Sequence, residues 1–175
     1  MASDGPGSGD GASVGGTLGT EIIERLIAQA PAHLAYWFDR GFYARTLEEH
    51  EFVWDPHTNR VCMTVRDEEG EVIGYKGRSS DPDAQPKYLV IGDRRGRNNY
   101  GFEPYKVTQA LYGLHSAKDH TRASATDHHT LIVCEGELNA VMMHQHGFKN
   151  AVGLPGSELS RDQAELIARY CDEAI

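Results

Sequence analysis

The chain has no apolar run long enough to cross a membrane and no closely spaced pair of cysteines. Because a bilayer-spanning helix needs about 20 consecutive apolar residues, no membrane association is expected. The opening segment MASDGPGSGD contains neither the basic nor the apolar part of a secretory signal, which predicts a cytoplasmic protein. The three cysteines, Cys62, Cys134 and Cys171, are too far apart for a zinc module, so no zinc is expected in this chain.

The chain also lacks an excess of basic residues. It has 17 Lys and Arg against 26 Asp and Glu, a formal net charge of −9 in 175 residues. This balance excludes a protein that coats nucleic acid through bulk electrostatics, because neutralising phosphates requires clustered cations. Residues 86–106 differ, since two acidic residues there are outnumbered by five basic ones: Lys87, Arg94, Arg95, Arg97 and Lys106. Phosphates are expected to bind at this segment, where Tyr88 and Tyr100 would stack a base; a solvated loop is the alternative for its three arginines.

The N-terminal part begins with a glycine-rich stretch and continues with helical patterns. Residues 1–20 contain seven of the nineteen glycines and are predicted to be a disordered tail. Apolar spacing predicts one helix over 21–30 and a second over His33–Arg40 that ends at Gly41. Thr46 and the glutamate three residues later form a capping-box pattern, which predicts a third helix from Leu47.

A change of period marks the next segment as β structure. Apolar residues alternate with polar ones over 61–66, which predicts a half-buried strand, and 71–78 is expected to return after a tight turn as a hairpin. Residues 79–104 are rich in glycine, proline, asparagine and arginine and are predicted to be irregular. Helical signals return near Val107.

The C-terminal part alternates strand and helix. After a polar linker over 118–129, the pattern predicts strands at 131–134 and 151–152 and helices at 138–146 and 161–170. This alternation indicates an α/β fold with a parallel sheet. Gly147 is expected to follow the end of the first helix, and Ser160 with Gln163 predicts a capping box at the start of the second. His144 and His146 are expected at the surface.

Glu135 and Gly136 come directly after the apolar strand 131–134 and before a helix. Ligands bind at the carboxyl edge of an open parallel sheet, so a carboxylate there can hold Mg²⁺ or act as a general base. The glycine would let a phosphate approach closely. The alternative is a charge that only stabilises the start of the helix through its dipole.

Several motifs in order resemble one family. The segment LIVCEGELNAVMMHQHGFKNAVGLPGSELS is similar to the first half of the Toprim domain of bacterial and phage DnaG-type primases. Upstream, NRVCMTVRDEEGEVIGYKGR resembles the strand pair of that family with its basic Gly-Arg end. The Lys-Tyr-Leu and Leu-Tyr-Gly-Leu signatures of the family stand at 87–89 and 111–114. The resemblance covers about residues 36–175.

The resemblance implies a fold and a set of site residues. It implies a primase-like α+β subdomain over 21–117, the linker 118–129, and over 130–175 a partial, Rossmann-like Toprim sheet that lacks its Asp-x-Asp strand. Glu135 matches the catalytic carboxylate linked to Mg²⁺ or Mn²⁺. The template and nucleotide would be bound by Arg40, Arg78, Lys87, Tyr88 and Lys106, with support from Gly136, Asn139 and Gly156. Asn139 stands where the family has Asp, and this neutral side chain is a weaker partner for a cation.

The implied function is synthesis of short RNA primers from ribonucleoside triphosphates on single-stranded DNA at the replication fork. The Asp-x-Asp strand of the family falls beyond Ile175, and one carboxylate cannot hold two metal ions. We therefore expect a second polypeptide to complete the Toprim sheet beside strand 131–134, whose edge would otherwise be unpaired. The chain has no Walker phosphate loop, so a replicative helicase is expected as a separate partner. The alternatives are an inactive DNA-binding remnant or accessory subunit and a Toprim nuclease or topoisomerase fragment.

Overall fold

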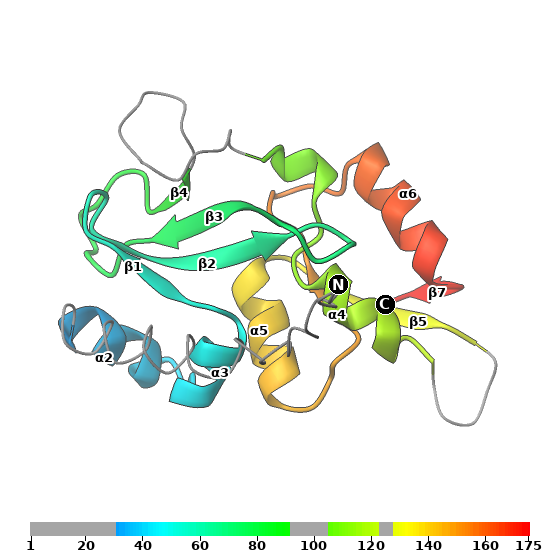
Figure 1. The fold of residues 1–175 in the computed structure, drawn as a ribbon, viewed down its shortest axis with the longest axis horizontal. Coiled ribbons are helices and arrows are strands. Elements are labelled where there is room, and N and C mark those ends of the chain that lie inside the picture. Colours follow the sequence, from blue (N-terminus) through cyan, green and yellow to red (C-terminus); the bar gives the residue numbers. More distant parts are fainter. Residues whose placement is uncertain (1–30, 92–104, 123–127) are drawn as a thin grey trace, which may run out of the picture.

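The computed structural model describes residues 31–91, 105–122 and 128–175. Within these ranges it contains a four-stranded antiparallel sheet, ordered β1-β2-β3-β4, and a three-stranded parallel sheet, ordered β6-β5-β7 (Figure 1). None of the described helices has the length and apolar character needed to cross a bilayer. The elements are α2 (Pro31–Asp39), α3 (Ala44–Glu49), β1 (Val53–Asp55), β2 (Arg60–Arg66), β3 (Val72–Arg78), β4 (Tyr88–Ile91), the 3₁₀ turn η1 (Val107–Gln109), α4 (Leu114–Ala117), the 3₁₀ turn η2 (Lys118–His120), β5 (Thr130–Cys134), α5 (Glu137–Gln145), β6 (Ala151–Gly153), α6 (Arg161–Tyr170) and β7 (Glu173–Ala174).

The predicted tail 1–20, the helix 21–30 and the residues Arg94, Arg95, Arg97 and Tyr100 lie outside the described residues. The division of the chain at 117 and 129 remains a prediction. Part of the expected linker is structured, because η2 begins at Lys118 and Arg122 forms a β-bridge with His129.

The two N-terminal helices pack through aromatic and aliphatic side chains. Helix α2 is confirmed, and Gly41, with a φ of 87°, follows it in the left-handed conformation that glycine adopts easily. The start predicted for α3 is wrong. This helix begins at Ala44, and Thr46 lies buried inside it rather than capping it. Packing of Thr46 and Leu47 therefore decides where α3 begins.

The hairpin of β2 and β3 is confirmed, with Val61 opposite Arg78 and Thr64 opposite Tyr75. The prediction that its first strand is half-buried is wrong, because six of the seven β2 residues are buried. Strand β2 lies between β1 and β3 and contributes to a core on one face, so alternation along the sequence does not describe its burial. The stretch predicted to be irregular contains β4, which pairs with β3 and brings Tyr88 opposite Arg78.

The alternating strands and helices of the C-terminal part are confirmed. Strands β5 and β6 run parallel, with Val133 opposite Val152. Gly147 has a φ of 93° just after the end of α5, and the capping box of α6 forms because the Ser160 side chain accepts the Gln163 N–H while the Gln163 side chain accepts the Ser160 N–H. His144 contradicts its prediction, since it is buried.

The second edge of β5 also differs from the expectation. Strand β7 pairs with it in parallel, Thr130 opposite Glu173, and the Val133 N–H donates to the Ile175 carbonyl at 2.8 Å. The prediction that this chain leaves the edge unpaired is therefore wrong. The reason is that the chain becomes extended at Cys171, directly after α6, and returns beside β5.

Helix α5 connects the two sheets. Its residues Ala140 and Val141 belong to the same core cluster as Trp37 of α2 and Met63 of β2, and Figure 1 shows α5 between the antiparallel sheet and the parallel strands. A second cluster joins β5, β6 and α6 around Leu131. The carboxyl edge of the parallel sheet is thus held against the antiparallel sheet.

Candidate functional site

Glu135 follows β5 directly and is exposed at the carboxyl edge of the parallel sheet. Its neighbours are fixed on both sides: the Cys134 carbonyl accepts the Leu154 N–H at 3.0 Å, and the Gly136 carbonyl accepts the Ala140 N–H at 3.3 Å. Within the described ranges the Glu135 carboxylate makes no hydrogen bond or ion pair. It is therefore available to a cation or a ligand.

Glu137 rather than Glu135 is the acidic residue in the first turn of α5. The alternative role considered for Glu135, a charge that stabilises the helix start, is consequently available to Glu137 instead. Glu137 is buried, with 3% of its surface exposed, although a carboxylate is rarely buried without a partner. Its partner is Lys76 of β3, whose Nζ donates to Glu137 Oε1 at 2.6 Å.

A glycine at the end of β6 sets how closely the Glu135 loop approaches its neighbour. A Cβ atom on Gly153 would lie 2.7 Å from the Glu137 Cα and 2.8 Å from the Gly136 carbonyl oxygen. Both distances are well below van der Waals contact. Only glycine at this position allows the loop after β5 to lie against β6.

Arg78 lies among aromatic rings. Its Cζ is 4.7 Å from the ring centroid of Tyr36 and 5.3 Å from that of Tyr88, distances typical of cation–π contacts. Arg78 Nε and Nη1 are buried without a hydrogen-bond partner among the described residues. Arg40 lies over the same Tyr36 ring at 5.5 Å. The structure thus brings Arg40, Arg78 and Tyr88 together.

Lys76 connects this aromatic and arginine group to the Glu135 loop. Its Nζ lies 5.3 Å from the Tyr88 ring centroid while it is bonded to Glu137. The sequence predicted neither Lys76 nor Glu137 as a site residue. Nothing local marks the pair, because its members are 61 residues apart and meet only in the tertiary fold.

The remaining predicted site residues make no hydrogen bond or ion pair with Glu135 among the described residues. Lys87 and Lys106 are exposed next to β4 and η1. Asn139 is exposed on the first turn of α5, and open space surrounds Gly156 in the loop after β6.

The possible metal ligands at the carboxyl edge of the parallel sheet fit one cation better than two. In the part of the chain that the structure describes, no three His, Cys, Asp or Glu side chains are grouped so that they could hold a metal ion. Mg²⁺ binds proteins through one or two carboxylates and keeps several waters. The exposed Glu135 carboxylate fits such an ion, whereas two metals need further carboxylates and Asn139, four residues later, is neutral.

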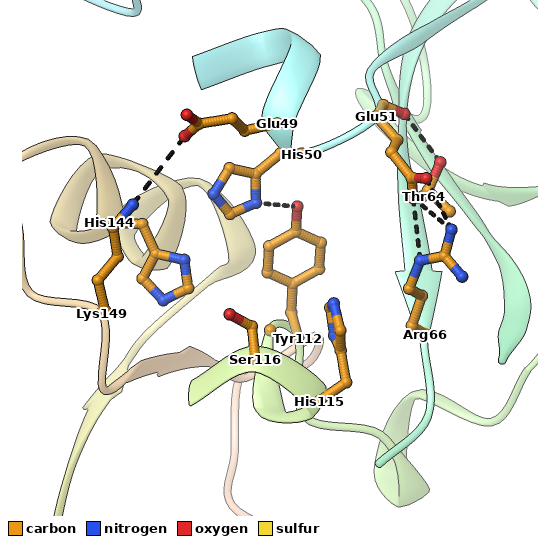
Figure 2. Close-up of a pocket in the computed structure, with 11 residues that line it drawn as sticks. Glu49, His50, Glu51, Thr64, Arg66, Tyr112, His115, Ser116, His144 and Lys149 are labelled. Atoms are coloured by element: carbon orange, nitrogen blue, oxygen red, sulfur yellow. Dashed lines mark hydrogen bonds and ion pairs between the residues drawn. The ribbon is translucent and has the colours of Figure 1, made fainter. Parts of the chain in front are cut away.

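A separate cavity of about 150 Å³ lies between α3, β2, α4 and α5 (Figure 2). Within it His50 Nδ1 is 3.0 Å from the Tyr112 hydroxyl, and His144 Nε2 is 2.7 Å from the Ala151 carbonyl oxygen. Burial lowers the pKa of His50 to about 3 and raises that of Tyr112, so both are neutral at pH 7. The sequence could have indicated that His144 is buried, because it lies three residues after the apolar Val141 and residues three apart share a helix face.

The two packed sheets, with an exposed carboxylate beside an arginine and tyrosine surface, have the fold of a primase catalytic core. The structure resembles the Aquifex aeolicus primase zinc-binding and RNA polymerase domains with a TM-score of 0.69 and 19% identity, covering 89% of this chain and 45% of that one. It resembles a DnaG primase catalytic domain bound to single-stranded DNA with a TM-score of 0.67 and 21% identity, covering 90% and 57%. These likenesses confirm the fold class.

The chain belongs to the family of the DNA primase catalytic core, N-terminal domain, whose model matches residues 21–118. It is 33% identical over 129 residues to a DNA primase of Clostridium acetobutylicum, covering 74% of this chain and 19% of that protein. It is 34% identical over 127 residues to a DNA primase of Deinococcus radiodurans, covering 73% and 20%. The resemblance to DnaG-type primases is thereby confirmed, and the chain spans about a fifth of the length of these relatives.

Proposed function

We propose that the chain is part of a primase that synthesises short RNA primers on single-stranded DNA in the cytoplasm. One observation carries the proposal: Glu135, exposed and without a partner among the described residues, stands at the sheet edge that Lys76 joins to the surface of Arg78 and Tyr88. Membership of the primase family supports this reaction, and a structural relative was solved with single-stranded DNA.

In this proposal the residues divide between metal binding and nucleic-acid binding. Glu135 holds Mg²⁺ or Mn²⁺, which when bound would neutralise phosphate charge and favour attack by a 3′ hydroxyl. Open space where a Cβ would stand at Gly136 and Gly156 leaves room for a phosphate. Tyr88, which is 40% exposed, stacks on a base. Phosphates of the template or of a ribonucleoside triphosphate are bound by Arg40, Arg78, Lys87 and Lys106.

The finer part of the proposal is that a second polypeptide supplies the Asp-x-Asp carboxylates. Polymerisation through two metals needs more acidic ligands than Glu135 offers. An apolar groove beside β7, lined in part by Val133, Leu159, Ile167 and Ile175, supports this, because Leu159 and Ile175 are large apolar residues that are more than half exposed. A replicative helicase is the other proposed partner.

The test is primer synthesis by the purified chain with its candidate partner, on single-stranded DNA with ribonucleotides and Mg²⁺. Glu135→Ala should abolish synthesis while single-stranded DNA binding is kept, because the carboxylate makes no hydrogen bond or ion pair to the described residues that would support the fold. Glu158→Ala removes another exposed carboxylate as the matched control and should leave synthesis unchanged.

Two results would reject the proposal. DNA binding without primer synthesis by the assembled wild type would indicate a binding module. Nicking of supercoiled DNA, lost on Glu135→Ala, would indicate a nuclease or topoisomerase fragment. Synthesis by the chain without any partner would reject only the second polypeptide.

A further inference from the structure

Lys76 binds the segments that follow β5 and β6 at the carboxyl edge of the parallel sheet. Its Nζ donates to Glu137 Oε1, at the start of α5 two residues after Glu135, and to the Pro155 carbonyl in the loop after β6, each at 2.6 Å. Lys76 itself belongs to β3 of the antiparallel sheet, where it lies between Met63 and Val90 of the neighbouring strands. The Lys76 ammonium group therefore joins the segments after β5 and β6 to the antiparallel sheet.

The ion pair between Lys76 and Glu137 is buried, and burial restricts its geometry. The side chains of Lys76 and Glu137 are 11% and 4% exposed, so water cannot replace either partner without a rearrangement. A buried ion pair is maintained only when its hydrogen bonds are well formed, and removal of one member leaves an uncompensated charge. Movement of the Glu137 side chain is consequently restricted.

In the part of the chain that the structure describes, the Glu135 side chain has no partner, so its position depends on its backbone. That backbone is held at Cys134 by β5 and, two residues beyond Glu135, at Glu137 by Lys76. Gly136, the residue between Glu135 and Glu137, has no Cβ to restrict the loop. Among the described residues, the Lys76–Glu137 bond is thus a side-chain restraint two residues from the carboxylate.

We propose that Lys76 is a positioning residue, which holds the Glu135 loop at a set place relative to Tyr88 and Arg78. The proposal rests on the function proposed above, because it assigns Lys76 to the same site. Lys76 also lies over the Tyr88 ring, but Arg78 lies over the same ring at the same 5.3 Å and would still hold it after a change at Lys76, whereas the bond to Glu137 would be lost. A change at Lys76 should therefore disturb the catalytic carboxylate more than the binding of DNA.

The first measurement uses the full chain alone and needs no catalysis. Amide hydrogen exchange of Leu154 and Ala140 reports the loop, because these N–H groups bond to the carbonyls on either side of Glu135. Lys76→Met should speed both exchanges about tenfold or more. The control is Arg66→Met, which removes a cation bonded to Glu51 and to the Gly70 carbonyl but no bond to the segments after β5 or β6, and should leave these exchanges unchanged.

A double variant separates positioning from stability. Lys76→Met with Glu137→Leu replaces the pair by apolar side chains, which commonly restores thermal stability. Exchange near Glu135 should stay fast, and in the assembled primase kcat should fall about tenfold while KM for the template stays within about twofold.

Two outcomes would overturn the role of Lys76. These are unchanged exchange in Lys76→Met, or recovery of wild-type kcat in the double variant. Failure of the proposed function is seen separately, since wild type would then make no primers whatever the exchange rates show.

Discussion

Burial of His50 should make the unfolding free energy of the protein fall as the pH is lowered. Its ring lies in the cavity of Figure 2, 5.1 Å from the ring of His144. Burial, followed by the smaller effects of charges at His144, Lys149 and His115, lowers its pKa from 6.5 to about 3. No carboxylate acts on it strongly enough to favour its protonation. The folded state therefore resists the proton that the unfolded state accepts.

The sign and size follow from linkage. Between pH 6.5 and 3 the unfolded chain binds more protons at His50, so its contribution is complete above pH 6.5 and is lost as the pH falls. At pH 4.5 the difference from neutral pH is two pKa units at about 1.36 kcal/mol each, or about 2.7 kcal/mol. This is a large share of the total stability of a domain.

Urea unfolding at pH 7.5 and pH 4.5 tests this prediction in three proteins. His50→Gln cannot titrate, so its loss of unfolding free energy between the two pH values should be smaller than that of wild type by about 2.7 kcal/mol. His57→Gln changes an exposed histidine and should lose as much as wild type. Equal losses in His50→Gln and wild type would refute the reasoning.

Two further substitutions test the site. Gly153→Ala should lower the unfolding free energy measured in urea by about 1 to 3 kcal/mol, because the new Cβ would meet Glu137. The control Gly156→Ala places its Cβ in open space and should cost less than about 0.5 kcal/mol. Equal costs in the two variants would contradict the close approach of the Glu135 loop to Gly153. Tyr88→Ala should weaken single-stranded DNA binding, measured by fluorescence anisotropy, about 5- to 150-fold, because one stacked base is lost. The control Tyr43→Ala also removes an exposed tyrosine and should leave the affinity unchanged. The same affinity in both variants would show that Tyr88 is not part of the interface.

Local patterns predicted much of the fold. The hairpin of β2 and β3, the order of strands and helices from β5 to α6 and the cap at Ser160 follow from period, turn residues and capping residues that lie close together in sequence. Glu135 was placed at the sheet edge for the same reason, since a short apolar strand ends just before it. Its catalytic role remains a proposal.

Burial was predicted less well where distant segments decide it. Six of the seven β2 residues are buried although apolar and polar residues alternate along it, and the start of α3 depends on packing of Thr46 rather than on a cap. His144 is buried because its ring reaches the carbonyl of Ala151 across the turn after α5. A pattern within one helix or strand cannot predict these contacts with distant segments.

By itself the amino-acid sequence determined the hairpin of β2 and β3, the order of strands and helices from β5 to α6, which family motifs occur, and that a glutamate follows an apolar strand. Only the tertiary structure decided that Lys76 meets Glu137 and Pro155, which are 61 and 79 residues away, and that β7 returns beside β5. The physical reason is that secondary structure responds to neighbours a few residues apart, whereas ion pairs and sheet edges form between segments that only the folded chain brings together.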